Sequence, residues 1–375
     1  MRSLWSSYVS LARLTVLAVC LSALAAAPAA ALEPGETAAI LAGTVAPAEL
    51  PADAQLSADA YAAHRTRMER AWQLYDDQRG RTLNLWTLEH VDLPTGGTVF
   101  YPFSGPDFVT PHRFYPHADR YVMVAMQIAG RPPDFGLSTG HSSTVLEVFR
   151  QGASQFGDLG YFITEELYEE FQNGAAVEGI TGMLMLMAVR EGHEVISIVP
   201  IRTDEQGEIV EIDPAQATAS DWASVRLRMR DTTDERDVIL DYLRLNLGDA
   251  WLDRHAGDAA FIRAMAANPM VFKAASHMPE TGWFETLVTA ALENSPLILQ
   301  DETGIPYDRL VEHFDVTLYG NYTESNGAFT PGQQPSLRAA YLERQDIEPL
   351  PFDYGYNKPA GSCLTQAVRA PQATP

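Results

Sequence analysis

MVFKAASHMPETGWFETLVTAALENSPLILQ, residues 270–300, contains a strand pattern, a helix pattern and a second strand pattern joined by short loops. The first apolar run covers 270–276, the helical pattern covers 284–293, and the second apolar run covers 296–300. Such alternation is typical of parallel strands joined by right-handed crossovers, so it predicts a fold of the α/β class. The alternation continues with a helix predicted at 306–313.

The middle of the chain predicts antiparallel hairpins instead. A β-rich run at 194–202 turns back into 208–212, and residues 225–230 alternate apolar side chains with arginines before another alternating run at 238–247. We therefore predict an α/β protein with a mixed, partly parallel sheet flanked by helices and an antiparallel, hairpin-rich section at about 194–247. Outside that section, strands are predicted at 98–103, 121–128 and 315–319, and helices at 139–156, 259–267 and 164–191, the last as a pair broken at Asn173-Gly174.

The remaining segments set the expected limits of the domain. A helix is predicted to begin at the N-cap residue Ser57, and residues 83–88 alternate in the manner of a strand. Residues 32–56 are rich in Ala, Pro and Glu without a clear period, which indicates a linker or an arm. Residues 357–375 are predicted to form a disordered tail. The α/β domain is therefore expected to span 57–356.

Residues 1–31 have the features of a secretory signal peptide. Arginines lie at its start, Leu14–Ala27 is apolar, and Ala29–Ala31 is typical of a cleavage site. Lipoprotein processing at Cys20 is an alternative, although the large Val19 precedes that cysteine. We expect an exported protein, periplasmic or else extracellular, with no membrane span after cleavage.

Charge and cysteine content narrow the classes of partner. Asp and Glu number 49 against 26 Lys and Arg, which gives a formal net charge of −23. Such a chain is not expected to bind nucleic acid or anionic lipid, because both need a basic surface. Beyond the leader, Cys363 is the only cysteine, so no internal disulfide is expected. Its position predicts a free thiol in the tail, with a disulfide between two chains as the alternative.

Polar residues follow three of the predicted strands, at Ser104–Asp107, at Ser276–His277 and at Gln300–Gly304. If these strands are parallel neighbours, the three loops converge on one edge of the sheet, where α/β proteins bind ligands. Asp107, Lys273 and Gln300 are the candidate binding residues there.

Lys273 lies in an apolar strand of a chain that otherwise uses Arg almost throughout. Such a lysine is expected either to reach solvent at the sheet edge or to pair with an acid such as Asp301.

The same loops also permit a hydrolase hypothesis. Ser104 would be the nucleophile, His277 the base and Asp301 the orienting acid, because such triads are defined by geometry and not by chain order. The G-x-S-x-G motif is missing, however, and in the alternative interpretation Ser104 and Asp107 only cap a turn and a short helix. Whether the protein is an enzyme stays open at this point.

No cofactor or metal motif is complete. The loop at Ser104–Asp107 has one glycine where a dinucleotide fingerprint needs several, and the Walker A pattern is absent. His112 and His117 lie five residues apart around Pro116, which fits no standard zinc motif. No metal is expected, and the cofactor is left unknown.

Four segments carry a resemblance to a known group of proteins, and they are FYPFSGPDF (100–108), SIVPIRTD (197–204), FKAASHMPETGWF (272–284) and ILQDETGIPY (298–307). They resemble uncharacterised exported bacterial proteins with YPFSGPDF-like and QDDSGIPY-like signatures, over roughly residues 60–356. The resemblance implies that both signature loops belong to one scaffold, and it supplies no reaction or catalytic residue. We therefore expect an exported envelope protein that binds a small molecule or a protein partner at the strand-exit edge, with a Ser104/His277/Asp301 hydrolase as the alternative.

Overall fold

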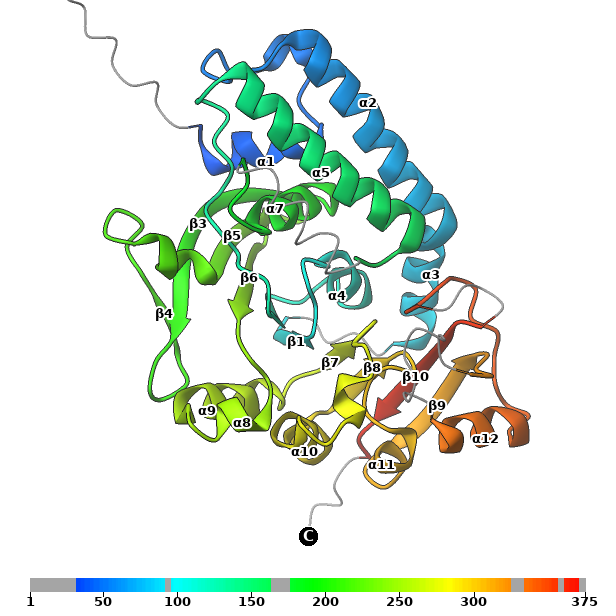
Figure 1. The fold of residues 1–375 in the computed structure, drawn as a ribbon. Coiled ribbons are helices and arrows are strands. Elements are labelled where there is room, and N and C mark those ends of the chain that lie inside the picture. Colours follow the sequence, from blue (N-terminus) through cyan, green and yellow to red (C-terminus); the bar gives the residue numbers. More distant parts are fainter. Residues whose placement is uncertain (1–31, 92–95, 163–175, 325–333, 357–360, 371–375) are drawn as a thin grey trace, which may run out of the picture.

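The computed structural model describes residues 32–91, 96–162, 176–324, 334–356 and 361–370. They form one mixed ten-stranded sheet with helices on both faces, which confirms the predicted α/β class (Figure 1). The strand order is β4-β3-β5-β6-β2-β1-β7-β8-β10-β9. The strands are β1 (Thr98–Pro102), β2 (Arg120–Ala125), β3 (His193–Thr203), β4 (Ile209–Glu211), β5 (Val225–Asp231), β6 (Asp237–Arg244), β7 (Met270–Phe272), β8 (Leu297–Gln300), β9 (Asp315–Gly320) and β10 (Cys363–Val368).

The centre of the sheet is parallel. Strands β6, β2, β1, β7 and β8 are successive parallel neighbours, with Tyr101 opposite Met123 and Phe100 opposite Met270. The three strands that precede the polar loops are therefore parallel neighbours, as the sequence analysis required, and β1, β7 and β8 end at the same edge of the sheet. Toward β4 the sheet is antiparallel through the pairs β6–β5, β5–β3 and β3–β4, which confirms the hairpin-rich section.

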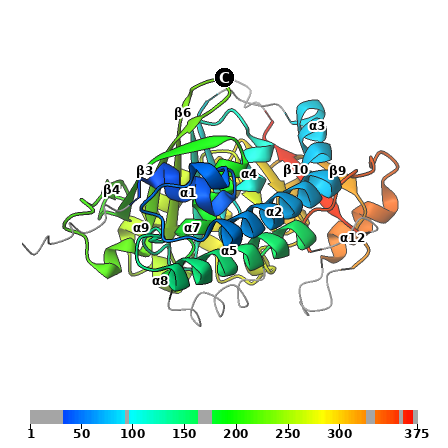
Figure 2. The ribbon, with the colours of Figure 1, turned by 90° about the horizontal axis from the view of Figure 1, so that it is seen from above.

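Helices cover both faces of the sheet. They are α1 (Pro34–Ala42), α2 (Ala58–Tyr75), α3 (Arg81–His90), α4 (Val109–Phe114), α5 (Thr139–Leu159), α7 (Thr181–Arg190), α8 (Asp249–Leu252), α9 (Ala256–Met265), α10 (Glu285–Asn294), α11 (Tyr307–Val311) and α12 (Pro335–Glu343). Side chains of β1 alternate between the two cores: Val99 and Tyr101 pack with residues of α1 to α7, and Phe100 packs with residues of α8 to α11. Helices α2 and α5 lie side by side on the first face (Figure 2).

The segment expected to be a linker contains helix α1. Pro34 stands in the first turn, Glu33 and Glu36 form a capping box, and Gly43 ends the helix in the left-handed conformation. The apolar side chains of Ile40 and Leu41 are completely buried, against α7 and β3. Of the two expectations for 32–56, the linker does not fit, because the segment contains a short helix packed against the domain as an arm would be.

The strand predicted at 83–88 is wrong. These residues belong to α3, which continues from α2 through a π-helical turn at Asp76–Gly80. Leu83, Trp86 and Thr87 are buried at the i, i+3, i+4 spacing of one helical face.

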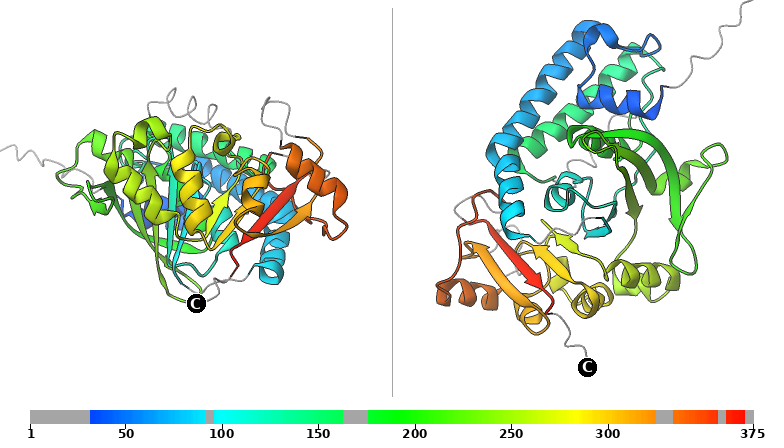
Figure 3. Two further views of the ribbon diagram at one scale, coloured as in Figure 1. Left: turned by 90° about the horizontal axis from the view of Figure 1, so that it is seen from below. Right: turned by 180° about the vertical axis from the view of Figure 1, so that it is seen from behind.

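The C-terminal segment is also corrected. Part of the expected disordered tail forms β10, which inserts antiparallel between β8 and β9 (Figure 3). Cys363 and Leu364 are completely buried there, so the thiol does not lie in a loose tail. The strands β8 and β9 are consequently separated by β10, although a helix connects them as predicted.

Some expectations fall outside the part of the chain that the structure describes. They are the signal peptide at 1–31, most of the first helix of the pair expected at 164–191, and the tail at 357–360 and 371–375. Among the described helices, none combines the length and apolar character needed to cross a membrane.

Candidate functional site

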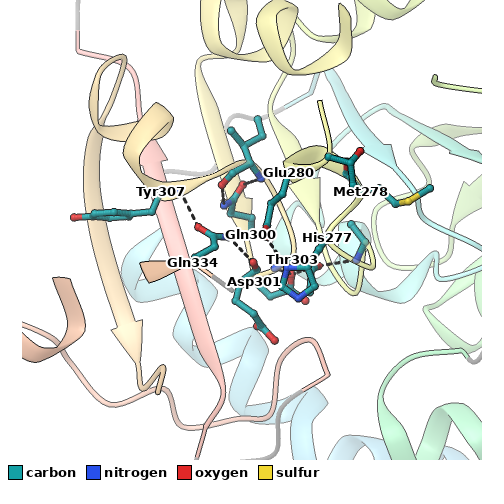
Figure 4. Close-up of polar contacts among 12 residues, drawn as sticks. His277, Met278, Glu280, Gln300, Asp301, Thr303, Tyr307 and Gln334 are labelled. Carbon is teal, nitrogen blue, oxygen red and sulfur yellow. Dashed lines mark hydrogen bonds and ion pairs between the residues drawn. The ribbon is translucent and has the colours of Figure 1, made fainter. Parts of the chain in front are cut away.

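The exits of β1, β7 and β8 form the strand-exit edge, which we define as residues 103–107, 273–280 and 300–305. Figure 4 shows the last two of these segments side by side, with His277 and Glu280 next to Asp301. Most polar side chains at the edge are buried, although Ser276 is exposed: Asp301 and Thr303 are completely inaccessible, and Ser104 is 5% exposed. An edge of this kind places many charged atoms away from water, so each of them needs a partner.

The backbone of this edge is strained. Phe103 has a φ of 59°, and Ala274, Ser276 and His277 have φ values of 52°, 54° and 56°. Residues other than glycine adopt this left-handed conformation at a cost on the order of 1–3 kcal/mol each, and such residues concentrate at functional sites. Within the described residues one other non-glycine residue shares it, Glu235 in the turn between β5 and β6.

Lys273 pairs with Asp107, and not with Asp301. Its Nζ donates to Asp107 Oδ2 at 2.8 Å, to Thr110 Oγ1 at 2.7 Å and to the Gly160 carbonyl at 2.5 Å. Asp107 also accepts from the backbone N–H of Thr110 at 3.1 Å and so caps α4. The ammonium of Lys273 therefore ties the exits of β1 and β7 to the end of α5.

Asp301 stabilises the strained exit of β7. Its Oδ2 accepts from the N–H of Ala274 at 2.7 Å, and its Oδ1 accepts from the N–H and the hydroxyl of Thr303. Thr303 in turn accepts from the N–H of Ala275 at 2.7 Å. Gly355 leaves the space for this carboxylate, because a Cβ at Gly355 would lie 2.2 Å from Asp301 Oδ2.

Gln300 holds the loop that follows β8. Its side-chain amide donates to the carbonyl of Ile305 at 2.7 Å and accepts from the N–H of Ile305 at 2.9 Å. A Cβ at Gly304 would lie 2.5 Å from the Gln300 side-chain oxygen, which explains the glycine. Both polar atoms of the Gln300 side chain are therefore hydrogen-bonded to the backbone of its own loop.

His277 lies next to Glu280 in the turn after β7. Its Nδ1 is 2.5 Å from Glu280 Oε1, and Glu280 also accepts from the side-chain amide of Gln334 at 3.1 Å. Gln334 donates as well to the carbonyl of Glu302 and accepts from the N–H of Tyr307 (Figure 4). A carboxylate on Nδ1 fixes the orientation of the imidazole, as in His–acid pairs that act as bases.

Two adjacent carboxyl groups share the interior of this edge. Burial raises the pKa of Asp301, and burial together with the neighbouring Asp301 raises the pKa of Glu302 well above its usual range. The thiol of Cys363 donates to Glu302 Oε2 at 3.6 Å, and burial likewise raises its pKa. These shifts favour the protonated, neutral forms of Glu302 and Cys363.

The proposed triad is not supported by the hydrogen bonds at this edge. Ser104 Oγ donates to the carbonyls of Gly105 at 3.0 Å and Val124 at 3.4 Å. His277 Nδ1 faces Glu280, and Asp301 is used by Ala274 and Thr303 as described above. Ser104 and Asp107 instead occupy the turn and helix-cap positions of the alternative interpretation.

A cavity and an exposed apolar surface accompany these loops. The cavity measures about 30 Å³, enough for a water molecule, and is lined by Tyr101, Phe103, Ser104, Gly105, Asp107, Tyr161, Phe162, Lys273 and Ala274. Large apolar side chains are exposed in the segments that follow β2 and β7, and we call four of them the apolar rim: Met126, Ile128, Met278 and Trp283. Trp283 is 72% exposed, and its neighbour Phe284 packs edge-on against Phe103 of the β1 exit.

Several residues in or in contact with this edge were not found from the sequence. Glu280 stands three residues after His277, and Thr110 three residues after Asp107, so helical spacing was the available signal. Tyr356, which donates to the carbonyl of Ala274 at 2.7 Å, comes from a distant segment and left no local signal.

The histidines considered for a metal lie apart from the edge. His112 is buried and pairs with Glu191 at 2.8 Å, and His117 is exposed. Within the described residues, no group of three or more His, Cys, Asp or Glu is placed to hold a metal ion.

Comparison with known proteins gives no match. No family model, no curated protein and no solved structure matches this chain. The strand-exit edge is therefore interpreted from its own geometry.

Proposed function

We propose that this chain is an exported envelope protein that binds a ligand at the strand-exit edge. The observation that carries the proposal is the concentration of left-handed backbone at Phe103, Ala274, Ser276 and His277, next to buried charged groups. Strained backbone of this kind clusters at active sites and at segments that hold ligands, which supports a binding role for this edge. The features of residues 1–31 support export.

The apolar rim indicates the kind of ligand. Trp283, Met126 and Met278 are 72%, 56% and 37% exposed on the segments that follow β7 and β2. Large exposed apolar side chains after the strand exits suit a ligand with an apolar part, and the cavity beside Ser104 suits a small polar group. In this arrangement the polar group lies toward the 30 Å³ cavity beside Ser104, and the apolar part lies on the rim.

Native mass spectrometry of the protein isolated gently from its own cells tests this proposal. The wild type is compared with Trp283→Ala, and with Leu342→Ala as a control, since Leu342 lies on α12 and is 70% exposed. We expect a reproducible extra mass on the wild type and on the control that is lost from Trp283→Ala. A bare wild-type mass, or an extra mass that Trp283→Ala retains, would contradict a ligand held at the rim.

One observation favours a hydrolase as a second candidate. The carboxylate of Glu280 orients His277, so this pair could supply a general base, with Glu280 in the role first given to Asp301. A serine-directed phosphonate probe tests the idea by intact mass. Label that is lost in Ser104→Ala but kept in Ser276→Ala would identify Ser104 as the nucleophile, and an unlabelled wild type would exclude the triad.

A further inference from the structure

Helix α1 packs on the rest of the domain without taking part in the sheet. Its side chains Ile40 and Leu41 are completely buried, and the helix lies against α7 and β3. Strand β3 is paired with β5 from His193 to Pro200, and this ladder does not involve α1. The separation of α1 from the domain therefore exposes apolar side chains but breaks no strand pair.

The end of α1 is tied to α2 by two hydrogen bonds. The ring Nε2 of His64 lies 2.9 Å from the carbonyl oxygen of Leu41, and the Tyr61 hydroxyl donates to the carbonyl of Val45 at 3.2 Å. Because a carbonyl oxygen only accepts, Nε2 of His64 carries the proton of the neutral ring. The packed position of α1 therefore depends on one tautomer of a single histidine.

A second proton on His64 does not fit this packing. The ring is completely buried, and its Nδ1 has no hydrogen-bond partner among the described residues. The one ionisable side chain of α1, Glu36, stands in the first turn, at the other end of the helix from Leu41. Protonation would create a buried N–H without an acceptor, together with a buried positive charge, and both are costly.

The charged groups around His64 oppose its protonation as well. Arg150 of α5 and Arg190 of α7 both act on the ring electrostatically. Their carboxylate partners, Glu147 and Glu69, have side chains that are 47% and 69% exposed, so water screens these acids. Burial above all, and then the two arginines, lower the pKa of His64 to about 4, although its hydrogen bonds to the backbone act in the other direction.

We propose that protonation of His64 releases α1 from α2, α7 and β3 in acid while the sheet stays folded. Neutral His64 stabilises the packed position at pH values above 6.5, the usual histidine pKa, and this contribution is lost as the pH falls toward 4. Release uncovers the apolar side chains of α1 and the surface of α7 beneath them, where Met183–Ala188 are all completely buried in the packed state.

Hydrogen exchange followed by mass spectrometry tests this release in the purified protein, on peptides from α1 and from the central strand β2. The protein is labelled at pH 7 and at pH 4, with times scaled for the intrinsic exchange rate. A pKa that moves from 6.5 to about 4 shifts the equilibrium between packed and released α1 by about a hundredfold between these pH values. The protection of α1 should fall by that factor, and β2 should stay more protected than α1.

Two variants assign the effect to His64. His64→Gln keeps a donor for the carbonyl of Leu41 but cannot take up a proton, so its α1 should lose little protection between pH 7 and pH 4. His117→Gln makes the same change at an exposed histidine and should follow the wild type. Each variant is compared with its own value at pH 7, which removes any constant loss of packing.

Three results would each overturn the proposal. The first is unchanged protection of α1 in the wild type at pH 4. The second is a hundredfold loss in His64→Gln like that of the wild type. The third is a fall of α1 and β2 to the same level of protection, because that result shows unfolding of the whole domain instead of release of α1.

Discussion

The pair Lys273–Asp107 gives the sharpest test of how the strand-exit edge is built. Lys273→Met removes the ammonium but keeps an unbranched apolar chain of similar length. The ammonium makes three hydrogen bonds and is 6% exposed, and Asp107 is 3% exposed. Removing one member of a buried ion pair costs about 3–5 kcal/mol, because the other charge stays buried without its partner. We therefore expect Lys273→Met to lose about that much free energy of unfolding.

A double-mutant cycle separates the pair from its surroundings. Asp107→Asn keeps an acceptor for the N–H of Thr110 and removes the charge. The double variant has no buried charge left at this point, so it should be more stable than the sum of the two single losses predicts. For groups in direct contact we expect a coupling on the order of 2 kcal/mol.

Urea unfolding at about pH 7, followed by tryptophan fluorescence and far-ultraviolet circular dichroism, measures all four proteins. Arg228→Met is the control, because the ion pair of Arg228 with Glu211 is at the surface, with the Arg228 side chain 43% exposed, and should contribute less than about 1 kcal/mol. The reasoning would be refuted by a Lys273→Met loss no larger than that of the control, or by single losses that simply add.

Three further predictions concern buried acids and one glycine. Burial alone would raise the pKa of Glu191, but Arg113 and His112 hold it at about 2 instead of 4.5. At 1.36 kcal/mol per pKa unit, ionised Glu191 contributes about 3 kcal/mol to the free energy of unfolding at pH values above its usual pKa. This contribution is lost as the pH falls toward 2. Glu191→Gln should therefore be less stable than wild type at neutral pH and differ little from it near pH 2 in an acid titration. The pKa of Glu302 is raised, so the contribution of its protonated form to folding stability is present at pH values below its usual pKa and is lost as the pH rises. Between about pH 4.5 and 8, the urea midpoint should therefore fall less steeply in Glu302→Gln than in wild type. Gly355→Ala should cost about 2 kcal/mol more than Gly282→Ala in urea unfolding, because φ is positive at both but only the former Cβ meets Asp301.

The parallel centre of the sheet could be predicted because its signals are local. Short loops and the change from strand to helix pattern within 270–300 allow few topologies, and three of the ladders are parallel neighbours as expected. The sequence therefore also placed Ser104, His277 and Asp301 correctly at the exits of β1, β7 and β8. It did not reveal which residues they contact.

The helix α3 could not be read in the same way. Leu85 and Leu88 are apolar but 64% and 67% exposed. Together with the buried Leu83 and Trp86 they produce an alternating pattern that resembles a strand and hides the helical one. Exposed leucines carry no packing information, so the period of two appeared by chance.

Strand β10 was missed for the opposite reason. Thr365 and Gln366 are polar but 1% and 7% exposed, since the strand is covered on both sides by β8 and β9. A strand placed between others by chain segments far away in sequence has a pattern set by tertiary packing, which local composition does not reveal.

The partner of Lys273 was equally beyond the sequence. Acids follow both neighbouring strands, Asp107 after β1 and Asp301 after β8, and both exits flank β7 in the sheet. In the structure Asp107 lies just before α4 and accepts hydrogen bonds from Thr110, and Lys273 donates to both residues.

The internal bonds of the edge divide its residues into two roles. Lys273, Asp107, Gln300 and Asp301 are occupied by partners within the protein, so they are better placed to hold the strained backbone than to contact a ligand. The groups left to contact a ligand belong to the strained residues Phe103, Ala274, Ser276 and His277 and to the apolar rim. Substitution of an internal residue should therefore lower stability and binding together, whereas Trp283→Ala should lower binding alone. Stability and affinity measured on the same variants thus distinguish residues that position the edge from residues that bind at it.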